Sequence, residues 1–386
     1  MKNKKQYKII VICFFVLTIR FSAISQVFYV SPTGADTNPG TLALPWATFQ
    51  KAASTLVAGQ TVYFRAGIYN GYVVINQSGT ASDPITFASY PNENAIIDGL
   101  SILPDPSNPN INELLQIWGD YILIRKIEFR NAARNSIVSG YPTVFNIFDS
   151  LHVHNGYRVG ISLYQSSHNI VSNCIIHDMY DYANTSTGGG GGNADGIAVS
   201  AGNTTPYPDF GHNTIRNNVV YNCSDDGIDT WSSRDNLIEN NEVHNTGFTN
   251  LGNGYLGALG LPAGNGNGFK LGGGGNGSGN NVVINNVSYS NRVSGFDGNG
   301  IINGGNANTL LNNTSFNNLR GFRAMETAVT VKNNIAYNCT LDTTGTAGIS
   351  QNNSWDLGIT NPNFISIIPN TPNLSPLRKV FSTHRA

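Results

Sequence analysis

A short polar motif returns along this chain at a nearly constant interval, and this repetition limits the folds that the chain can adopt. The segment Ile-Arg-Asn-Asn-Val-Val-Tyr-Asn at 215–222 alternates apolar side chains around a central polar pair, and four similar segments follow it. The second residue of each pair is an asparagine, at Asn218, Asn241, Asn286, Asn313 and Asn334. Looser copies precede these at Lys126, Ser150 and Asn173. Neighbouring copies are therefore about 23 residues apart, or twice that distance.

A period of this length, filled with short alternating strands and with Asn and Gly at the bends, is typical of a parallel β-helix. Each coil is expected to hold about three strands and three turns, and the chain is long enough for about ten coils. A β-propeller is the alternative repeat architecture, but its blades run to about 40–50 residues. We expect the asparagine column to form an internal ladder of side chains that satisfies backbone groups at a bend.

A second repeated feature is a glycine followed by Ile or Phe, which marks the start of another short strand in each coil. This pair begins at Gly160, Gly196, Gly227, Gly268, Gly295 and Gly321. The glycine-rich stretches 188–192 and 252–266 precede two of these strands and predict loops.

Composition agrees with a packed all-β chain and excludes some functions. Of the 386 residues, 43 are glycine and 40% are hydrophobic, which is enough apolar material for a core. Charged residues make up only 12% and the net charge is −1, so a broad basic surface for nucleic acid is not expected. Cys174, Cys223 and Cys339 are an odd number once the N-terminal segment is set aside, so we expect small buried side chains and no disulfide framework.

The two ends of the chain differ from the repeats. Residues 1–25 combine several lysines, an apolar run and the small residues of Ala-Ile-Ser, which predicts a bacterial-type export signal. The protein is then secreted or periplasmic and free of the membrane after cleavage; a membrane anchor is the alternative. Residues 26–370 are predicted to form the β-helix and 371–386 a C-terminal tail. Within 46–57, the helical spacing of apolar side chains predicts an amphipathic helix that caps the open end of the first coil.

Alignment of the coils on the Gly-Ile/Phe strand brings acidic residues together. Asp195 and Asp226 each precede the glycine, so they fall in one column, one rung apart. Asp229 and Lys270 fall one rung apart in a second column, and Asp225 lies in the adjoining bend. Because neighbouring parallel strands lie about 4.8 Å apart, the sequence predicts four carboxylates and one amine close together.

Four carboxylates at that spacing repel one another by about 3 kcal/mol per pair at an effective dielectric of about 20. A hard divalent cation offsets this repulsion, and a ligand set made only of oxygen atoms favours calcium. We therefore expect Asp195, Asp225, Asp226 and Asp229 to bind Ca²⁺. The alternative is that these aspartates only cap turns, as Asp-Gly sequences often do.

The expected role of Lys270 is that of a base. Glycines flank it in Asn-Gly-Phe-Lys-Leu-Gly-Gly at 267–273, which leaves room for a substrate. Burial beside a cation lowers the pKa of a lysine and prepares the amine to accept a proton. The alternative is a purely structural salt bridge from Lys270 to Asp229 and Asp297.

Together, Asp-Gly-Ile-Ala at 195–198, Asp-Asp-Gly-Ile-Asp-Thr-Trp at 225–231 and the segment at 267–273 resemble the signature of polysaccharide lyase family 9. That family comprises pectate lyases with a right-handed parallel β-helix, and the resemblance extends over residues 27–340. It implies that the four aspartates bind calcium and that Lys270 is the Brønsted base.

The resemblance also implies an acidic polysaccharide substrate, polygalacturonate or a related uronide, cleaved by β-elimination after Lys270 removes the proton at C5. We expect the protein to act as a monomer. Arg292, Arg320 and Arg323 lie on the following coils and are predicted to hold further substrate carboxylates, with ordinary surface charge as the alternative.

Two other functions are compatible with the same fold. A β-helix glycoside hydrolase would use Asp225, Asp226 and Asp229 as acid and base and give Lys270 no chemical role. A non-catalytic carbohydrate-binding surface protein would need neither. The histidines, such as His152, His154 and His177, show no ligand spacing along the sequence, and surface or core positions are expected for them.

Overall fold

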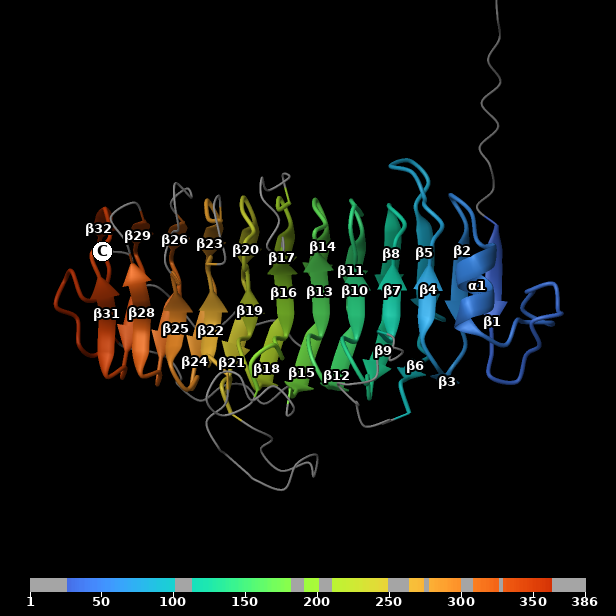
Figure 1. Ribbon diagram of the computed structural model, residues 1–386, viewed down its shortest axis with the longest axis horizontal. Helices are drawn as coiled ribbons and strands as arrows, with labels where there is room; N and C mark the ends of the chain where they lie inside the picture. Colours follow the sequence, from blue (N-terminus) through green and yellow to red (C-terminus); the bar gives the residue numbers. More distant parts are fainter. Residues whose placement is uncertain are drawn as a thin grey trace, which may run out of the picture.

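The computed structural model describes residues 26–100, 113–181, 191–200, 210–248, 264–273, 278–299, 308–325 and 329–362. Over these ranges the chain winds into one long solenoid in which each coil adds a strand to each of three parallel sheets (Figure 1). The predicted all-β, right-handed parallel β-helix is confirmed.

Sheet A has twelve strands. They are β1 (Val27–Val30), β2 (Thr61–Phe64), β5 (Ile85–Ser89), β8 (Ile122–Arg125), β11 (Ile147–Asp149), β14 (Ile170–Ser172), β17 (Thr214–Arg216), β20 (Leu237–Glu239), β23 (Val282–Ile284), β26 (Thr309–Leu311), β29 (Thr330–Lys332) and β32 (Ile349–Gln351).

Sheets B and C have ten strands each. Sheet B consists of β3 (Gly67–Asn70), β6 (Ala95–Asp98), β9 (Ile127–Arg130), β12 (His152–Gly156), β15 (Ile175–Met179), β18 (Val219–Cys223), β21 (Glu242–His244), β24 (Val287–Tyr289), β27 (Thr314–Phe316) and β30 (Ile335–Tyr337). Sheet C consists of β4 (Val73–Ile75), β7 (Leu115–Ile117), β10 (Ile137–Ser139), β13 (Ile161–Tyr164), β16 (Ile197–Ser200), β19 (Ile228–Asp229), β22 (Asn267–Lys270), β25 (Ser294–Asp297), β28 (Arg320–Met325) and β31 (Leu341–Gly345).

The polar pair makes the bend between sheet A and sheet B. Its first residue, such as Asn217, adopts a left-handed conformation (φ 57°), which asparagine tolerates better than most side chains. Its second residue turns inward: the Asn218 amide donates to Asn241 Oδ1 (3.0 Å), and the Asn241 amide donates to Asn286 Oδ1 (3.0 Å). The predicted internal asparagine ladder is therefore confirmed.

The looser copies were aligned one residue too early. Lys126, Ser150 and Asn173 have positive φ, as Asn217 does, so they match the first residue of the pair and not the second. Cys174 takes the ladder position that follows Asn173, and its backbone N–H donates to Asn218 Oδ1 (2.9 Å). The expected buried role of Cys174 follows from this inward position.

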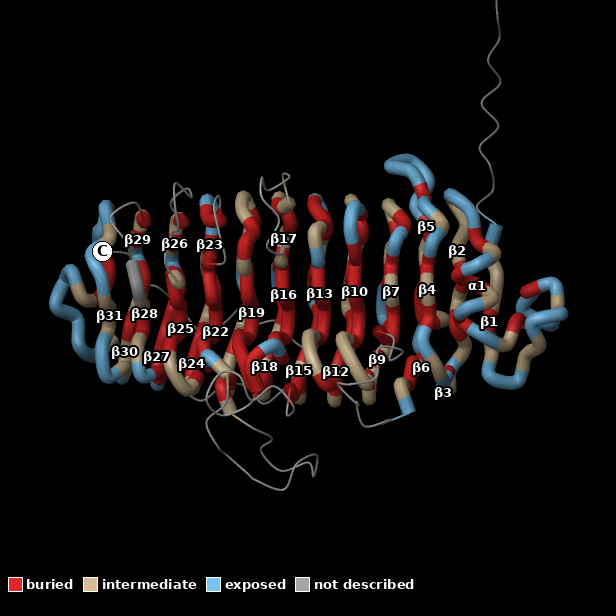
Figure 2. The backbone as a smooth tube through the Cα atoms, in the orientation of Figure 1, coloured by how far each residue is buried: buried red, intermediate tan, exposed pale blue. Residues whose placement is uncertain are grey.

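The core lies along the axis between the three sheets, and buried residues recur on every coil (Figure 2). Phe269, Phe296 and Phe322 stack at 4.7 and 4.9 Å between ring centroids, with planes within 7° of parallel. They follow the aligned glycines, and the observed register agrees with the predicted one. A side chain at Gly268 would lie 2.0 Å from Ser288 Oγ, so the tight inner turn explains the glycine.

The helix α1 (Phe49–Thr55) lies within the segment predicted to be helical. Thr48 caps it by accepting a hydrogen bond from the Lys51 N–H (3.0 Å), and Phe49, Ala52 and Ala53 are buried. The Gln50 side chain exchanges two hydrogen bonds with the backbone of Val74 in β4 (3.1 and 2.9 Å). The helix thus covers the first strand of sheet C.

The predicted export signal (1–25) and tail (371–386) lie outside the described residues, as does the end of the predicted β-helix domain beyond residue 362. Over the described ranges, no helix is both long enough and apolar enough to cross a bilayer.

Candidate active site

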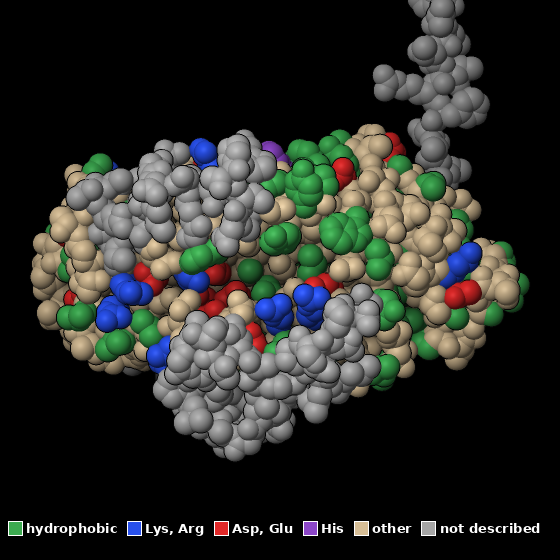
Figure 3. All heavy atoms as spheres, in the orientation of Figure 1, with side chains coloured by type: hydrophobic (Ala, Val, Ile, Leu, Met, Phe, Trp, Pro, Cys, Tyr) green, Lys and Arg blue, Asp and Glu red, His purple; other side chains and the backbone are tan. Residues whose placement is uncertain are grey.

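The predicted acidic and basic residues meet on the outer side of sheet C, on β16, β19 and β22 and the bends that precede them. Ile197 pairs with Ile228 and Ile228 with Phe269, so Asp229 lies directly beside Lys270. The register predicted for these two residues is confirmed. Figure 3 shows acidic side chains gathered near the middle of this face, with Lys and Arg side chains on either side.

Three aspartates form the centre of the site, here called the acidic cluster: Asp195, Asp225 and Asp226. All three are buried, and each offers a carboxylate oxygen within 4.8 Å of the other two. Backbone donors fix their orientation: Asp226 N–H donates to Asp195 Oδ1 (3.0 Å) and Asn193 N–H to Asp225 Oδ2 (2.9 Å). These hydrogen bonds hold the carboxylates close together although their negative charges repel.

The electrostatics of the cluster show how unfavourable this arrangement is for bare carboxylates. Burial, together with the charges of Asp225, Asp229 and Asp226, raises the pKa of Asp195 well above its usual value. Burial, aided by the Asp226 charge, raises the pKa of Asp225 to about 7. Burial raises the pKa of Asp229 to about 6, although the Lys270 charge opposes the shift. The positive charge of a bound cation would offset the repulsion between these carboxylates.

The residues present fit a calcium ion. The donor atoms are all oxygen, which suits a hard cation. Two further oxygens at the site, Asp229 Oδ1 and Asn267 Oδ1, are buried and have no hydrogen-bond partner among the described residues. Unpartnered buried oxygens carry a desolvation cost that coordination relieves.

Lys270 is buried directly against the carboxylates. Its Nζ lies 2.9 Å from Asp229 Oδ2 and 3.2 Å from Asp226 Oδ2. Asp229 is the one member of the predicted metal-binding set that lies outside the acidic cluster; its Oδ2 contacts Lys270, which leaves its Oδ1 as the oxygen that could reach a cation. Asp297, the other salt-bridge partner considered for Lys270, pairs with Arg323 instead (2.6 Å).

The pKa of Lys270 shifts in the direction opposite to the one expected from burial beside a cation. Burial does lower it, but the charges of Asp229, Asp226, Asp195 and Asp225 outweigh burial and raise the pKa of Lys270. The lysine therefore carries a proton while the carboxylates are uncompensated.

The three arginines predicted to bind substrate have different surroundings. Arg323 lies in the Lys270 column and forms the ion pair with Asp297. Arg292 donates to the carbonyl oxygens of Gly247 (2.8 Å) and Gly264 (2.6 Å), so it links these two described residues next to the acidic cluster. Arg320 begins β28, beside Ser294, and is partly exposed.

Two neighbours of the site were not assigned roles from the sequence. Asn267 follows Asp195 and Asp226 in their column, and its N–H and side-chain amide both donate to Asp226 Oδ1 (2.8 and 3.0 Å). The Trp231 ring lies 5.0 Å from Lys270 Nζ. Gly273 (φ +95°) allows this packing, because a Cβ there would lie 2.9 Å from the indole. The position of Asn267 in the same column as Asp195 and Asp226 was the sequence signal that could have identified it.

Two arginines on the N-terminal side of the cluster were also missed. Arg134 and Arg158 each lie three residues before the aligned isoleucine of β10 and β13, which is the position that Asp225 takes before β19. They occupy neighbouring coils, since Val159 N–H donates to Asn135 Oδ1 (3.0 Å). Arg134 forms an ion pair with Glu113 (3.4 Å). The shared spacing was the signal that could have identified both.

The fold and the site define a right-handed parallel β-helix protein with a cation-compatible acidic cluster and a buried lysine on one sheet. Residues 28–354 match the family described as "Pel9A-like, right handed beta helix region", so the chain belongs to this family. A relative named pectate lyase PEL9, from Emericella nidulans, is 28% identical over 299 residues, which cover 70% of this chain and 69% of the relative. The chain spans from 58% to 69% of the length of the curated pectate lyases that it matches.

Two solved structures share the fold. The crystal structure of pectate lyase Pel9A superposes with a TM-score of 0.73 at 24% identity, covering 89% of this chain and 83% of that one. A structure titled rhamnogalacturonan lyase superposes with a TM-score of 0.72 at 23% identity, covering 93% of this chain and 97% of that one. The family resemblance read from the sequence is confirmed, and the chain is an enzyme of the polysaccharide lyase class.

Proposed function

We propose that this protein is an exported, calcium-dependent lyase that cleaves polygalacturonate or a related uronide by β-elimination. The observation that carries the proposal is the contact of Lys270 with Asp229 and Asp226 at 2.9 and 3.2 Å, directly beside the acidic cluster. A buried amine next to a cation-binding set of carboxylates is suited to proton abstraction from a substrate whose own carboxylate approaches the cation. The basic, apolar segment at 1–25 supports export.

In this mechanism Asp195, Asp225 and Asp226 would hold the calcium ion together with Asp229 Oδ1, while Asp229 Oδ2 contacts Lys270. Bound calcium supplies a positive charge that binds the uronate carboxylate and stabilises the negative charge that develops as the C5 proton leaves. Lys270 accepts that proton in its neutral form. The C5–H electron pair forms the C4–C5 double bond, the C4–O bond breaks, and the leaving oxygen is protonated from solvent.

The surrounding residues position the reacting groups. Trp231 limits the freedom of the Lys270 side chain. Arg292 binds Gly264, and the N–H of the next residue, Asn265, donates to Asp225 Oδ1 (2.5 Å). Arg158 lies one coil, about 4.8 Å along the axis, before the coil of Asp195. A polymeric uronide that follows the axis of sheet C would present its next carboxylates to Arg158 and Arg134.

The substrate class is open to direct comparison. Relatives and structural neighbours are named for pectate and for rhamnogalacturonan, and both polymers carry uronates. We propose polygalacturonate as the preferred substrate, because the basic side chains Arg134 and Arg158 on successive coils fit a carboxylate on every sugar better than a carboxylate on alternate sugars.

The test follows the ultraviolet absorbance of the unsaturated product on polygalacturonate and on rhamnogalacturonan, with calcium or with chelator. Lys270→Ala is expected to lose about 10²–10⁴ of the rate, since it removes the general base. Lys332→Ala, on sheet A away from the site, is the matched control and should keep the wild-type rate. New reducing ends without absorbance would instead indicate a hydrolase that uses Asp225, Asp226 and Asp229, and binding without cleavage would indicate a carbohydrate-binding protein.

A further inference from the structure

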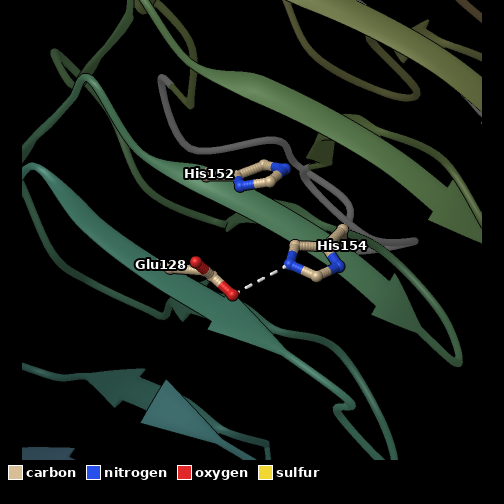
Figure 4. Close-up of side chains that lie close together, drawn as sticks. All are labelled: Glu128, His152 and His154. Atoms are coloured by element: carbon tan, nitrogen blue, oxygen red, sulfur yellow. Dashed lines mark hydrogen bonds and ion pairs between the residues drawn. The ribbon is translucent and has the colours of Figure 1, made fainter. Parts of the chain in front are cut away.

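A second group of ligating side chains lies on the outer face of sheet B, away from the acidic cluster. Glu128 on β9 and His152 and His154 on β12 each offer one ligand atom, and these atoms lie within 4.8 Å of one another. Figure 4 shows the two imidazoles and the carboxylate converging over the two strands. His177, on β15, adds a third imidazole. These four residues are called the sheet B histidine cluster.

The cluster exists because the solenoid converts distant sequence positions into neighbours. His152 pairs with Glu128 and His154 with His177 across the strands. His152 and His154, two residues apart on one strand, point to the same side of the sheet. These histidines show no ligand spacing along the sequence because the ligands come from three different coils.

The distances suit a small tetrahedral ion. His154 Nε2 lies 3.2 Å from Glu128 Oε1, and the Nε2 atoms of His152 and His177 lie 2.8 Å apart. Ligand atoms at about 2.0–2.1 Å from zinc lie about 3.3 Å from one another in a tetrahedron. The side chains therefore need only small rotations to surround an ion.

Outer hydrogen bonds already orient the ligands. His177 Nδ1 contacts Asp178 Oδ2 (2.8 Å), and His154 Nδ1 contacts Asn155 Oδ1 (2.5 Å), so the Nε2 atom of each ring faces the cluster. The Asn94 amide donates to Glu128 Oε2 (3.0 Å) and leaves Oε1 toward His154. A carboxylate on the second ring nitrogen, as Asp178 provides for His177, is an arrangement found behind metal-binding histidines.

Two features of the same face bear on this interpretation. The imidazoles of His154 and His177 are also part of a column of stacked rings that continues through Tyr221 and His244, so stacking alone accounts for some of their order. The 2.8 Å contact between the Nε2 atoms of His152 and His177 is a hydrogen bond when one of these two atoms carries a proton, and a metal ion would take the place of that proton. Arg130 lies 3.4 Å from Glu128 Oε1, and its charge is engaged by Asp98 (2.7 Å).

We propose that the sheet B histidine cluster is a binding site for a divalent transition metal, with zinc as the best match. Imidazole nitrogen and carboxylate oxygen are the ligand types that zinc accepts, whereas calcium requires oxygen ligands. The metal joins β9, β12 and β15, three successive coils, on a face that does not carry the acidic cluster. Its role is to fix these coils to one another, not to take part in the lyase reaction.

The experiment titrates purified protein with Zn²⁺ by calorimetry in the presence of excess Ca²⁺, and with Co²⁺ by visible absorption. Wild-type protein should bind one Zn²⁺ and give the intense visible bands of tetrahedral cobalt. His154→Phe keeps a stacked ring but removes a ligand, and it should weaken Zn²⁺ binding at least tenfold. His244→Phe, the same change three coils further along the column of rings, is the matched control and should bind as wild type does.

A second variant, Glu128→Gln, removes a different ligand and should also weaken Zn²⁺ binding. It distinguishes the loss of a ligand from misfolding of His154→Phe. Asp225→Asn tests whether the ion resides in the acidic cluster instead, and it should leave Zn²⁺ binding at one equivalent. Absence of Zn²⁺ binding to the wild type, or binding that survives both cluster variants and disappears in Asp225→Asn, overturns the proposal. In that case the histidines only stack.

Discussion

The calcium affinity of the acidic cluster is expected to rise steeply between pH 6 and pH 8. Burial, aided by the Asp226 charge, raises the pKa of Asp225 to about 7, and burial raises the pKa of Asp229 to about 6. Each carboxyl group must lose its proton before it can bind a cation, so protons compete with calcium over this range. The raised pKa of Asp195 acts in the same direction.

The size of the effect follows from the two pKa values. Asp225 and Asp229 together hold about 1.4 protons at pH 6 and about 0.1 proton at pH 8. The apparent calcium dissociation constant is therefore expected to be about 20-fold lower at pH 8 than at pH 6. Calcium binding should also release about 1.4 protons at pH 6 and about 0.1 proton at pH 8.

Calorimetry in two buffers of different ionisation enthalpy measures both quantities on the same protein. Asp149→Asn, on sheet A, changes an aspartate outside the site and should leave the pH dependence intact. Asp225→Asn should reduce the change in affinity to about twofold, the part that Asp229 contributes. An affinity that is equal at pH 6 and pH 8, with no proton release, would refute the idea that these buried carboxyls are the calcium ligands.

Four further outcomes are expected. Lys270→Ala should tighten calcium binding while it abolishes activity, because it removes a positive charge 3.2 Å from Asp226; weaker binding would contradict this. Without calcium, the stability contributed by Asp225 should be present at pH 4 and lost as the pH rises through 7. A thermal melt with chelator should therefore show a lower Tm at pH 8 than at pH 5. Added calcium should remove this difference in Tm. Arg158→Ala should raise KM about tenfold with little change in kcat, whereas an equal loss in kcat would assign it to the chemical step. Asn286→Ala leaves the Asn241 N–H and the Ile238 carbonyl unpaired, so chemical denaturation should show a loss of about 2–4 kcal/mol in the free energy of unfolding. Asn285→Gly, at an exposed position with φ 57°, is the control and should lower that free energy by less than about 1 kcal/mol.

The repeat made most of the fold predictable. Once Asn218 and its equivalents fix the register, the neighbours of every strand follow, and the sequence alone predicts the observed pairing of Asp229 with Lys270. The looser copies failed by one residue because Lys126 and Ser150 lack the second asparagine that marks the inward position.

The side-chain contacts were less predictable, because register places Cα atoms but not the ends of side chains. The alignment places Asp229 beside Lys270, but it does not express that Asp229 Oδ2 contacts the amine while Oδ1 has no hydrogen-bond partner among the described residues. Nor does it express that the Arg292 guanidinium donates to the carbonyl oxygens of Gly247 and Gly264. The pKa of Lys270 depends on the balance between burial and four nearby charges, which no sequence pattern expresses.

The unbroken pairing of sheet C tolerates large differences in the connections that lead into it. Four residues (224–227) join β18 to β19, whereas 22 residues (245–266) join β21 to β22, yet Asp229 and Lys270 remain side by side. The distance between Asp229 and Lys270 along the axis is set by the pitch of the solenoid and does not depend on the length of the connecting segments. Proteins with this fold can therefore change the segments that surround the substrate, and hence the polymer they recognise, while Asp229 and Lys270 keep their positions.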